Sequence, residues 1–221
     1  MSKPAEPRDA ATVVVLRDAA AFGRHGLEVY LVKRSRAVDF MAGAHVFPGG
    51  RLDKADSSLE ACAVRETFEE AGLVLDAAAL VPWVRWITPE ISPKRFDARF
   101  FLARAPEGQE PRVDGREATE GLWIAPADAM QRWEDGEIQL APATAKSIEM
   151  LLAFASVDAA LADATRRPPP VVMPVVWNDK ESGRAYISLP GDPRHPSPDV
   201  LSGKIHRFQL AEGRYRRVNA S

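Results

Sequence analysis

Three glutamates lie close together between residues 65 and 73, shortly after the turn sequence Pro48-Gly49-Gly50. Each residue of a helix advances by about 100°, so Glu66, Glu69 and Glu70 would share an arc of roughly 100° on one side of a helix. Carboxylate oxygens are the ligands that divalent cations prefer, and a bound cation would relieve the repulsion among the three charges. The spacing therefore favours a metal site, with a solvated acidic helix face as the alternative.

The surrounding sequence predicts a helix from about residue 57 to residue 71. Ser57 and Glu60 have the spacing of a capping box, and Gly72 stands where a glycine commonly ends a helix. Gly49-Gly50 allow the backbone to approach a ligand closely. The side of the helix opposite the glutamates is expected to pack into the core. Its residues are Ala61, Val64, Phe68 and Ala71.

The stretch from Gly50 to Leu73 resembles the Nudix box, with the pattern Gly-x5-Glu-x7-Arg-Glu-U-x-Glu-Glu-x-Gly-U, where U is an apolar residue. Thr67 stands where the second half of the pattern has an apolar residue. In the first half, residues 51–64 make fourteen positions where the pattern has thirteen, and no Glu occupies the expected place. Asp56 is the nearest acid, and one inserted loop residue is the simplest explanation. The residues that match are Arg65, Glu66, Glu69, Glu70, Gly72 and Leu73.

The resemblance implies a metal-dependent hydrolase that cleaves a diphosphate linked to another moiety by water attack on phosphorus. Glu66, Glu69 and Glu70 would bind Mg2+ or Mn2+, together with the backbone carbonyl of Gly49. Arg65 lies four residues before Glu69 and can brace that carboxylate on the helix. A purely structural ion pair and direct substrate contact are equally open for Arg65.

The general base varies in position within this superfamily, so the box does not assign it. Glu117 and Glu120 are the best candidates outside the box, with loop-surface acids as the alternative, and a box glutamate is a further candidate. Trp86, Phe100 and Trp123 could stack on a base, but their strand positions favour the core. The candidate catalytic residues are Arg65, Glu66, Glu69, Glu117 and Glu120.

Residues 40–53 and 65–72 look like the branch of Nudix proteins related to peroxisomal coenzyme A diphosphatases, and residues 86–89 and 95–97 add to that likeness. The Leu-Leu-Thr-x-Arg segment of other coenzyme A diphosphatases is not evident, although residues 32–35 stand where it would be. Coenzyme A or acyl-CoA is thus one candidate substrate. ADP-ribose, nucleotide sugars, dinucleoside polyphosphates, a non-catalytic ligand sensor and an RNA-processing role are the alternatives.

The order of the predicted elements resembles the Nudix α/β/α sandwich with a mixed sheet. We expect a flexible arm at residues 1–11, a hydrolase domain at 12–167, and a β-rich extension at 168–221 that packs on the domain or on a partner subunit. A turn is predicted at residues 23–26. Strands are predicted at residues 12–17, 28–34, 45–47, 83–88, 95–103, 121–124, 171–176 and 185–189, and helices at 57–71, 126–133 and 142–156.

Composition narrows the partners of the 221-residue chain. Its formal net charge of −2 gives no basic field of the kind that nucleic acid requires. The single cysteine, Cys62, excludes an internal disulfide framework, and small buried packing is its expected role. No apolar segment is long enough to cross a membrane. We expect a cytoplasmic protein that takes a small diphosphate substrate, and the resemblance implies a homodimer.

Overall fold

A computed structural model describes residues 4–19, 26–35, 42–113 and 115–218. Most of the turn expected at 23–26, and Phe40 and Met41 of the branch likeness, lie outside these residues. The main sheet has eight strands in the order β3-β2-β1-β6-β5-β8, with β4 paired to β1 and β7 paired to β2. The strands are β1 Arg8–Asp18, β2 Leu27–Arg34, β3 His45–Val46, β4 Gly49–Arg51, β5 Val81–Ile87, β6 Phe96–Arg104, β7 Ala118–Ile124 and β8 Val171–Val172.

The central strand β1 explains the layered architecture. Its side chains alternate between the two faces of the sheet, as in any strand. Val14 and Leu16 belong to one hydrophobic cluster and Val13 and Val15 to the other, and all four are fully buried. Because β1 must be covered on both faces, its sequence is a continuous apolar run.

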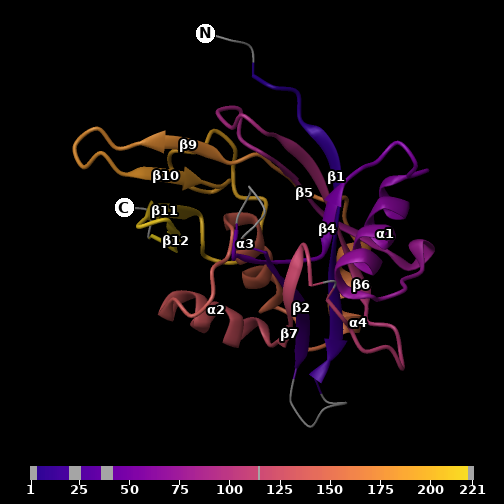
Figure 1. The fold of residues 1–221 in the computed structure, drawn as a ribbon. Coiled ribbons are helices and arrows are strands. Elements are labelled where there is room, and N and C mark those ends of the chain that lie inside the picture. Colours follow the sequence, from indigo (N-terminus) through magenta and orange to yellow (C-terminus); the bar gives the residue numbers. More distant parts are fainter. Residues whose placement is uncertain (1–3, 20–25, 36–41, 114, 219–221) are drawn as a thin grey trace.

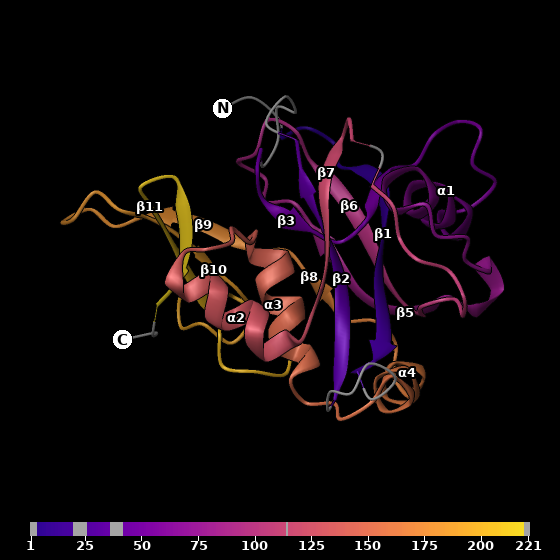
Figure 2. The same ribbon diagram turned by 60° about the horizontal axis from the view of Figure 1, so that its bottom comes forward.

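Helix α1 Leu59–Ala71 covers one face of the sheet, and α2 Pro126–Asp135, α3 Pro142–Leu151 and α4 Val157–Thr165 supply the cluster on the other. Figure 2 shows α1 and the pair α2 and α3 on opposite sides of the sheet. A short 3-10 turn, η2, spans Ala77–Ala79. The expected α/β/α sandwich with a mixed sheet is confirmed, since β1 pairs in parallel with β6 and antiparallel with β2.

The C-terminal extension forms a second, antiparallel sheet in the order β12-β11-β10-β9. Its strands are β9 Val175–Asn178, β10 Ala185–Ser188, β11 Arg207–Ala211 and β12 Arg214–Arg217. Figure 1 shows this sheet in orange and yellow beside α2 and α3. Leu189, Leu201, Ile205 and Phe208 are buried in the same hydrophobic cluster as α2 and α3, so the extension packs on the body of the same chain.

Several predicted boundaries differ from the structure. Strand β1 begins at Arg8, so residues 8–11 of the expected arm belong to the sheet. Helix α1 is capped by Ser58, whose side chain accepts from the Ala61 N–H, so the capping box predicted from Ser57 is wrong. Gly72 ends that helix in the left-handed conformation, as predicted.

The helix predicted to run from 142 to 156 ends at Leu151. A separate helix, α4, begins after Ser156, whose side chain caps it by accepting from the Ala159 N–H. The hairpin of β11 and β12 is not predicted by the sequence patterns. None of the helices formed by the described residues is long and apolar enough to cross a membrane.

Candidate active site

Of the four residues of α1 predicted to face the core, Ala71 is fully buried, but the helix otherwise buries a different set. Its buried residues include Ala63, Thr67 and Glu70, whereas Phe68 is 55% exposed. The Thr67 hydroxyl donates to the Ala63 carbonyl at 2.7 Å, which satisfies a polar group where the Nudix pattern has an apolar one. The small side chains on this face let α1 lie close to β1. Two of the glutamates therefore face the sheet, and the expectation that Phe68 packs into the core is wrong.

Glu66 and Glu70 line a cavity of about 770 Å³ beside the main sheet. The Glu70 carboxylate accepts from the Gly49 N–H at 3.0 Å. A Cβ placed on Gly50 would lie 2.5 Å from both Glu66 carboxylate oxygens, so a larger residue there would push the carboxylate out of this position. The turn before α1 thus holds both carboxylates at one edge of the cavity.

Burial raises the pKa of Glu66, and it raises the pKa of Glu70 to about 7. The negative charge of Glu117 raises both pKa values further, while the Gly49 N–H and Arg34 lower that of Glu70. Two desolvated carboxylates next to each other hold charge poorly without a proton or a cation. Their donor set therefore fits a hard divalent ion.

Glu69 does not join this pair. Its side chain is 56% exposed and accepts from Arg65 at 3.0 Å, and it is not among the cavity residues. Within the described ranges, no group of three or more His, Cys, Asp or Glu side chains has the arrangement of a metal site. The structure thus brings Glu66 and Glu70 together and leaves the third predicted ligand outside the cavity.

Arg65 organises the loop before α1. Its guanidinium donates to both carboxylate oxygens of Asp56, at 2.9 and 2.8 Å, and to Glu66 at 2.7 Å. The same group also donates to the Arg51 carbonyl at 3.3 Å. These bonds lower the pKa of Asp56 to about 2. Asp56 is thus the acid that the longer loop supplies to Arg65, although the sequence pattern gives it no role.

The two base candidates outside the box are separated. Glu117 lines the cavity. Glu120 lies near the start of β7 and pairs with Lys33 of β2. Its carboxylate accepts from the Lys33 side chain at 3.2 Å, and its own side chain is 54% exposed. The cavity residues therefore include Glu117 and exclude Glu120.

The aromatic candidates are also separated. Trp86 and Phe100 are buried and both contribute to the cavity wall. Trp123 is on the other face of the sheet, 5.1 Å from Tyr30 between ring centroids and beneath the Arg17 guanidinium. Cys62 is buried as expected, and burial raises the pKa of its thiol to about 12, which keeps it unreactive.

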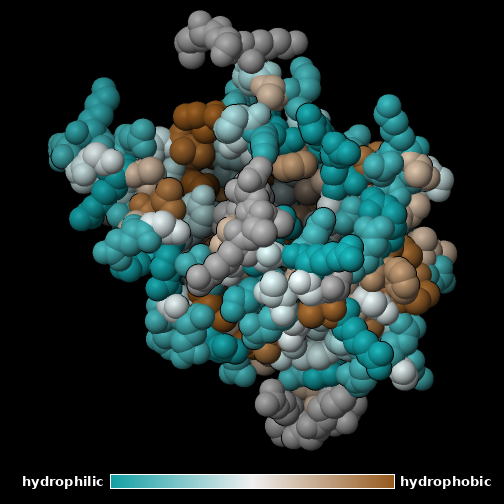
Figure 3. Space-filling model, viewed as in Figure 1, coloured by the Kyte–Doolittle hydropathy of each residue, from teal (hydrophilic) through white to brown (hydrophobic). Residues whose placement is uncertain are grey.

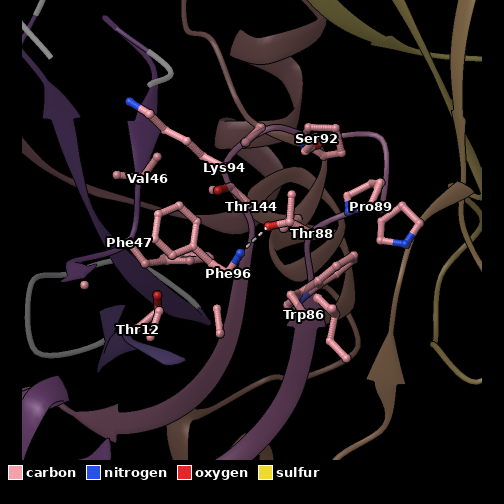
Figure 4. Close-up of a pocket in the computed structure, with 18 of the residues that line it drawn as sticks. Thr12, Val46, Phe47, Trp86, Thr88, Pro89, Ser92, Lys94, Phe96 and Thr144 are labelled. Carbon is pink, nitrogen blue, oxygen red and sulfur yellow. Dashed lines mark hydrogen bonds between the residues drawn. The ribbon is translucent and has the colours of Figure 1, made fainter. Parts of the chain in front are cut away.

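The cavity has further polar residues that the sequence analysis did not assign. Figure 4 shows Thr12, Val46 and Phe47 on one side and Trp86, Thr88 and Pro89 on the other, with Lys94 from the β5–β6 connection. Thr88 accepts from the Phe96 N–H at 3.0 Å and so orders this connection. The sequence gives one local indication of such cavity residues, which is a basic residue at the end of a strand or in a turn. The basic residues of the wall are Arg34, Arg51 and Lys94.

Comparison with known proteins gives a match to the NUDIX domain over residues 6–146. A Caenorhabditis elegans protein provisionally named nudix hydrolase 7 is 28% identical over 155 aligned positions, and the alignment covers 52% of each chain. A Xenopus laevis protein named acyl-coenzyme A diphosphatase NUDT19 is 22% identical over 281 aligned positions, covering 80% of this chain and 73% of the relative. The chain thus spans about half of the first relative's length and about three quarters of the second's.

Among solved structures, a Nudix hydrolase from Alicyclobacillus acidocaldarius superposes with a TM-score of 0.64 at 27% identity. The superposition covers 71% of this chain and 96% of that one. The part of the chain left over is large enough to hold the second sheet.

Proposed function

We propose that this chain, which belongs to the Nudix family because residues 6–146 match its domain, hydrolyses a diphosphate bond that links a nucleoside diphosphate to a second group. The observation that carries the proposal is a pair of carboxylates, the buried Glu70 and the half-buried Glu66, that line a cavity of about 770 Å³. This volume lies within the range of roughly 300 to 1,000 Å³ that is usual for small-molecule sites.

Glu66, Glu70 and the Gly49 carbonyl are the groups that would hold Mg2+ or Mn2+. When bound, a divalent ion neutralises charge on the phosphate oxygens and makes hydroxide available near neutral pH. Glu69 would join as the third carboxylate only after its side chain leaves Arg65, to which it is bonded at 3.0 Å. Arg65 then remains held by Asp56 and continues to fix the Glu66 carboxylate.

The remaining steps belong to the chain's own side chains. Glu117 is our proposed general base, because it is the candidate outside the box that lines the cavity. Its carboxylate would take the proton from the attacking water. Arg34, Arg51 and Lys94 line the same cavity and would bind the oxygens of the anionic substrate.

For the substrate, we propose coenzyme A or an acyl-CoA. The names of the relatives support this choice, since the Xenopus laevis protein is called an acyl-coenzyme A diphosphatase. ADP-ribose, nucleotide sugars and dinucleoside polyphosphates share the same diphosphate and form the comparison panel. The cytoplasmic location and the homodimer stay predictions, checked by cell fractionation and by light scattering.

A turnover screen tests the proposal. The purified protein is incubated with CoA, dodecanoyl-CoA, ADP-ribose, UDP-glucose or diadenosine tetraphosphate, with Mg2+, Mn2+ or EDTA. We expect hydrolysis that EDTA abolishes. Glu66→Gln and Glu70→Gln should each lower kcat by about 100-fold or more, because each removes a charged ligand worth several kcal/mol in the transition state.

Glu60→Gln is the matched control, since Glu60 lies in the first turn of the same helix and is not a cavity residue. Circular dichroism checks that each variant keeps the fold. Unchanged turnover in both Glu66→Gln and Glu70→Gln would sink the site assignment. Binding of a panel compound without turnover in the unmodified protein would favour the ligand-sensor alternative.

A further inference from the structure

One face of the second sheet is apolar. Directly paired residues of neighbouring strands project to the same face, and Val176 pairs with Ile187 while Leu210 pairs with Tyr215. Ile187 also pairs with Phe208, which is buried against Trp133 at 6.0 Å between ring centroids. This face therefore turns toward the Nudix domain. The larger side chains of this face at the cavity, which we call the apolar wall, are Val176, Ile187, Leu210 and Tyr215.

The apolar wall is continuous with the site but lies outside the matched domain. The domain match ends at residue 146, whereas all four wall residues come after residue 175. They line the same cavity as Glu66 and Glu70. The cavity therefore combines carboxylates and basic groups from the domain with hydrocarbon from the extension.

Hydrocarbon is left exposed on both sides of this region. Leu210 is 42% exposed, and Ile91, a cavity residue on the β5–β6 connection, is 73% exposed. Figure 3 shows hydrophobic residues gathered where that connection and the second sheet lie. Contiguous apolar surface rimmed by polar residues is typical of ligand-binding grooves.

The extension is held firmly enough to serve as a preformed wall. On its opposite face Trp177 stacks on Tyr186, with 4.6 Å between the ring centroids. Arg207 Nε forms a buried ion pair with Asp192 Oδ2 at 2.7 Å. Glu149 of α3 accepts from the backbone N–H groups of Lys204 and Ile205, which ties the extension to the domain. A wall ordered before binding loses little entropy when a ligand docks.

We propose that the apolar wall is the specificity determinant of the site and that it binds an acyl or alkyl chain carried by the substrate. The inference rests on the proposed function, because the carboxylates of the same cavity would fix where the diphosphate lies. A nucleobase would be a poorer occupant of this wall, because the wall residues offer aliphatic side chains and one tyrosine, whereas a base also needs hydrogen-bond partners.

The experiment measures kcat/KM for CoA and for its butanoyl, octanoyl and dodecanoyl thioesters with the full chain and Mg2+. We expect kcat/KM to rise with chain length. In Ile187→Asn and in Leu210→Gln, the ratio of dodecanoyl-CoA to CoA should fall about 10-fold, within the discrimination that hydrophobic pockets reach. The change should appear in KM, since the chain is remote from the reacting phosphorus.

Gln209→Ala is the matched control, because Gln209 neighbours Leu210 but projects to the opposite face. It should leave the ratio unchanged. Equal losses for CoA and dodecanoyl-CoA in the wall variants, or no dependence on chain length in the unmodified protein, would overturn the proposal. So would a wall variant that changes the oligomeric state in light scattering, since the wall would then be an interface between copies.

A second readout separates this proposal from the proposed function. Calorimetric titration of the Glu70→Gln protein with CoA and with dodecanoyl-CoA measures binding without turnover. Tighter binding of the dodecanoyl thioester that Ile187→Asn removes would support the wall even if the unmodified protein hydrolyses none of the panel. Equal affinity for the two compounds would refute the wall even if hydrolysis is found.

Discussion

Asp56→Asn removes the negative charge that the Arg65 guanidinium holds through two hydrogen bonds. The Asp56 side chain is 5% exposed and that of Arg65 is 30% exposed, so solvent screens the pair in part. The pair lowers the pKa of Asp56 from 3.8 to about 2. At about 1.36 kcal/mol for each pH unit, this difference corresponds to roughly 2 kcal/mol of stability at pH 7. We treat that figure as an upper limit, because Asn keeps part of the hydrogen bonding.

The sign of the pH dependence follows from the direction of this shift. The pKa of Asp56 is lower in the folded protein than in the unfolded chain. Its contribution to the free energy of unfolding is therefore complete above about pH 4 and is lost as the pH falls toward about 2. By the same linkage, about half of the contribution remains at pH 3. The stability advantage of the unmodified protein over Asp56→Asn should therefore shrink on acidification.

Urea unfolding at pH 7, 5 and 3 measures the difference directly. Asp53→Asn serves as the control, since Asp53 lies on the same loop and its side chain accepts from the Ala55 N–H, a bond that Asn can also make. Equal stability of Asp56→Asn and the unmodified protein at pH 7 would refute the reasoning. So would a difference between them that stays constant down to pH 3.

Two other perturbations test separate parts of the structure. Glu117→Gln should lower kcat by about 100-fold or more if Glu117 is the general base. Glu120→Gln should change kcat less than about twofold, because Glu120 lies outside the cavity and pairs with Lys33. Steady-state kinetics at the same Mg2+ concentration measures both variants, and a larger loss in Glu120→Gln would exchange the two roles. Glu149→Ala should destabilise the fold by about 3–5 kcal/mol in urea unfolding, because it leaves the fully buried Lys146 without its carboxylate; a loss below about 1 kcal/mol would show that Lys146 reaches another partner or loses its proton.

Local patterns were enough to predict the helix that carries the site and the glycine that ends it. They predicted the buried side of α1 only in part, since Ala71 is buried and Phe68 is exposed. The prediction assumed that carboxylates and core occupy opposite faces, but Ala63 and Thr67 are small enough for the helix to pack on β1 through the same face as Glu66 and Glu70. Helical periodicity gives the angle between residues and not the direction of the sheet.

The altered first half of the Nudix box is a second feature that local patterns could not interpret. Asp56 reaches Arg65 across nine residues because the loop turns back, with the Asp53 N–H donating to the Asp56 carboxylate at 2.8 Å. A pattern that counts positions cannot recognise a partner that an inserted residue has moved. The ion pair between Arg65 and Asp56 depends on where the carboxylate lies in space, and the loop places it within hydrogen-bond distance although its position in the sequence differs from the pattern.

The extension is the part that sequence reasoning could least assign. Strand β11 is only five residues long and pairs with β10, which lies some twenty residues earlier, so no short turn indicates the pairing. Even a correct set of strands would not have placed Leu210 and Tyr215 in the same cavity as Glu66. That juxtaposition depends on how the second sheet packs on α2 and α3, through contacts such as Trp133 with Phe208. The proposed metal-binding carboxylates are therefore encoded locally in α1, while the proposed selectivity of the apolar wall is encoded in long-range packing that no local pattern carries.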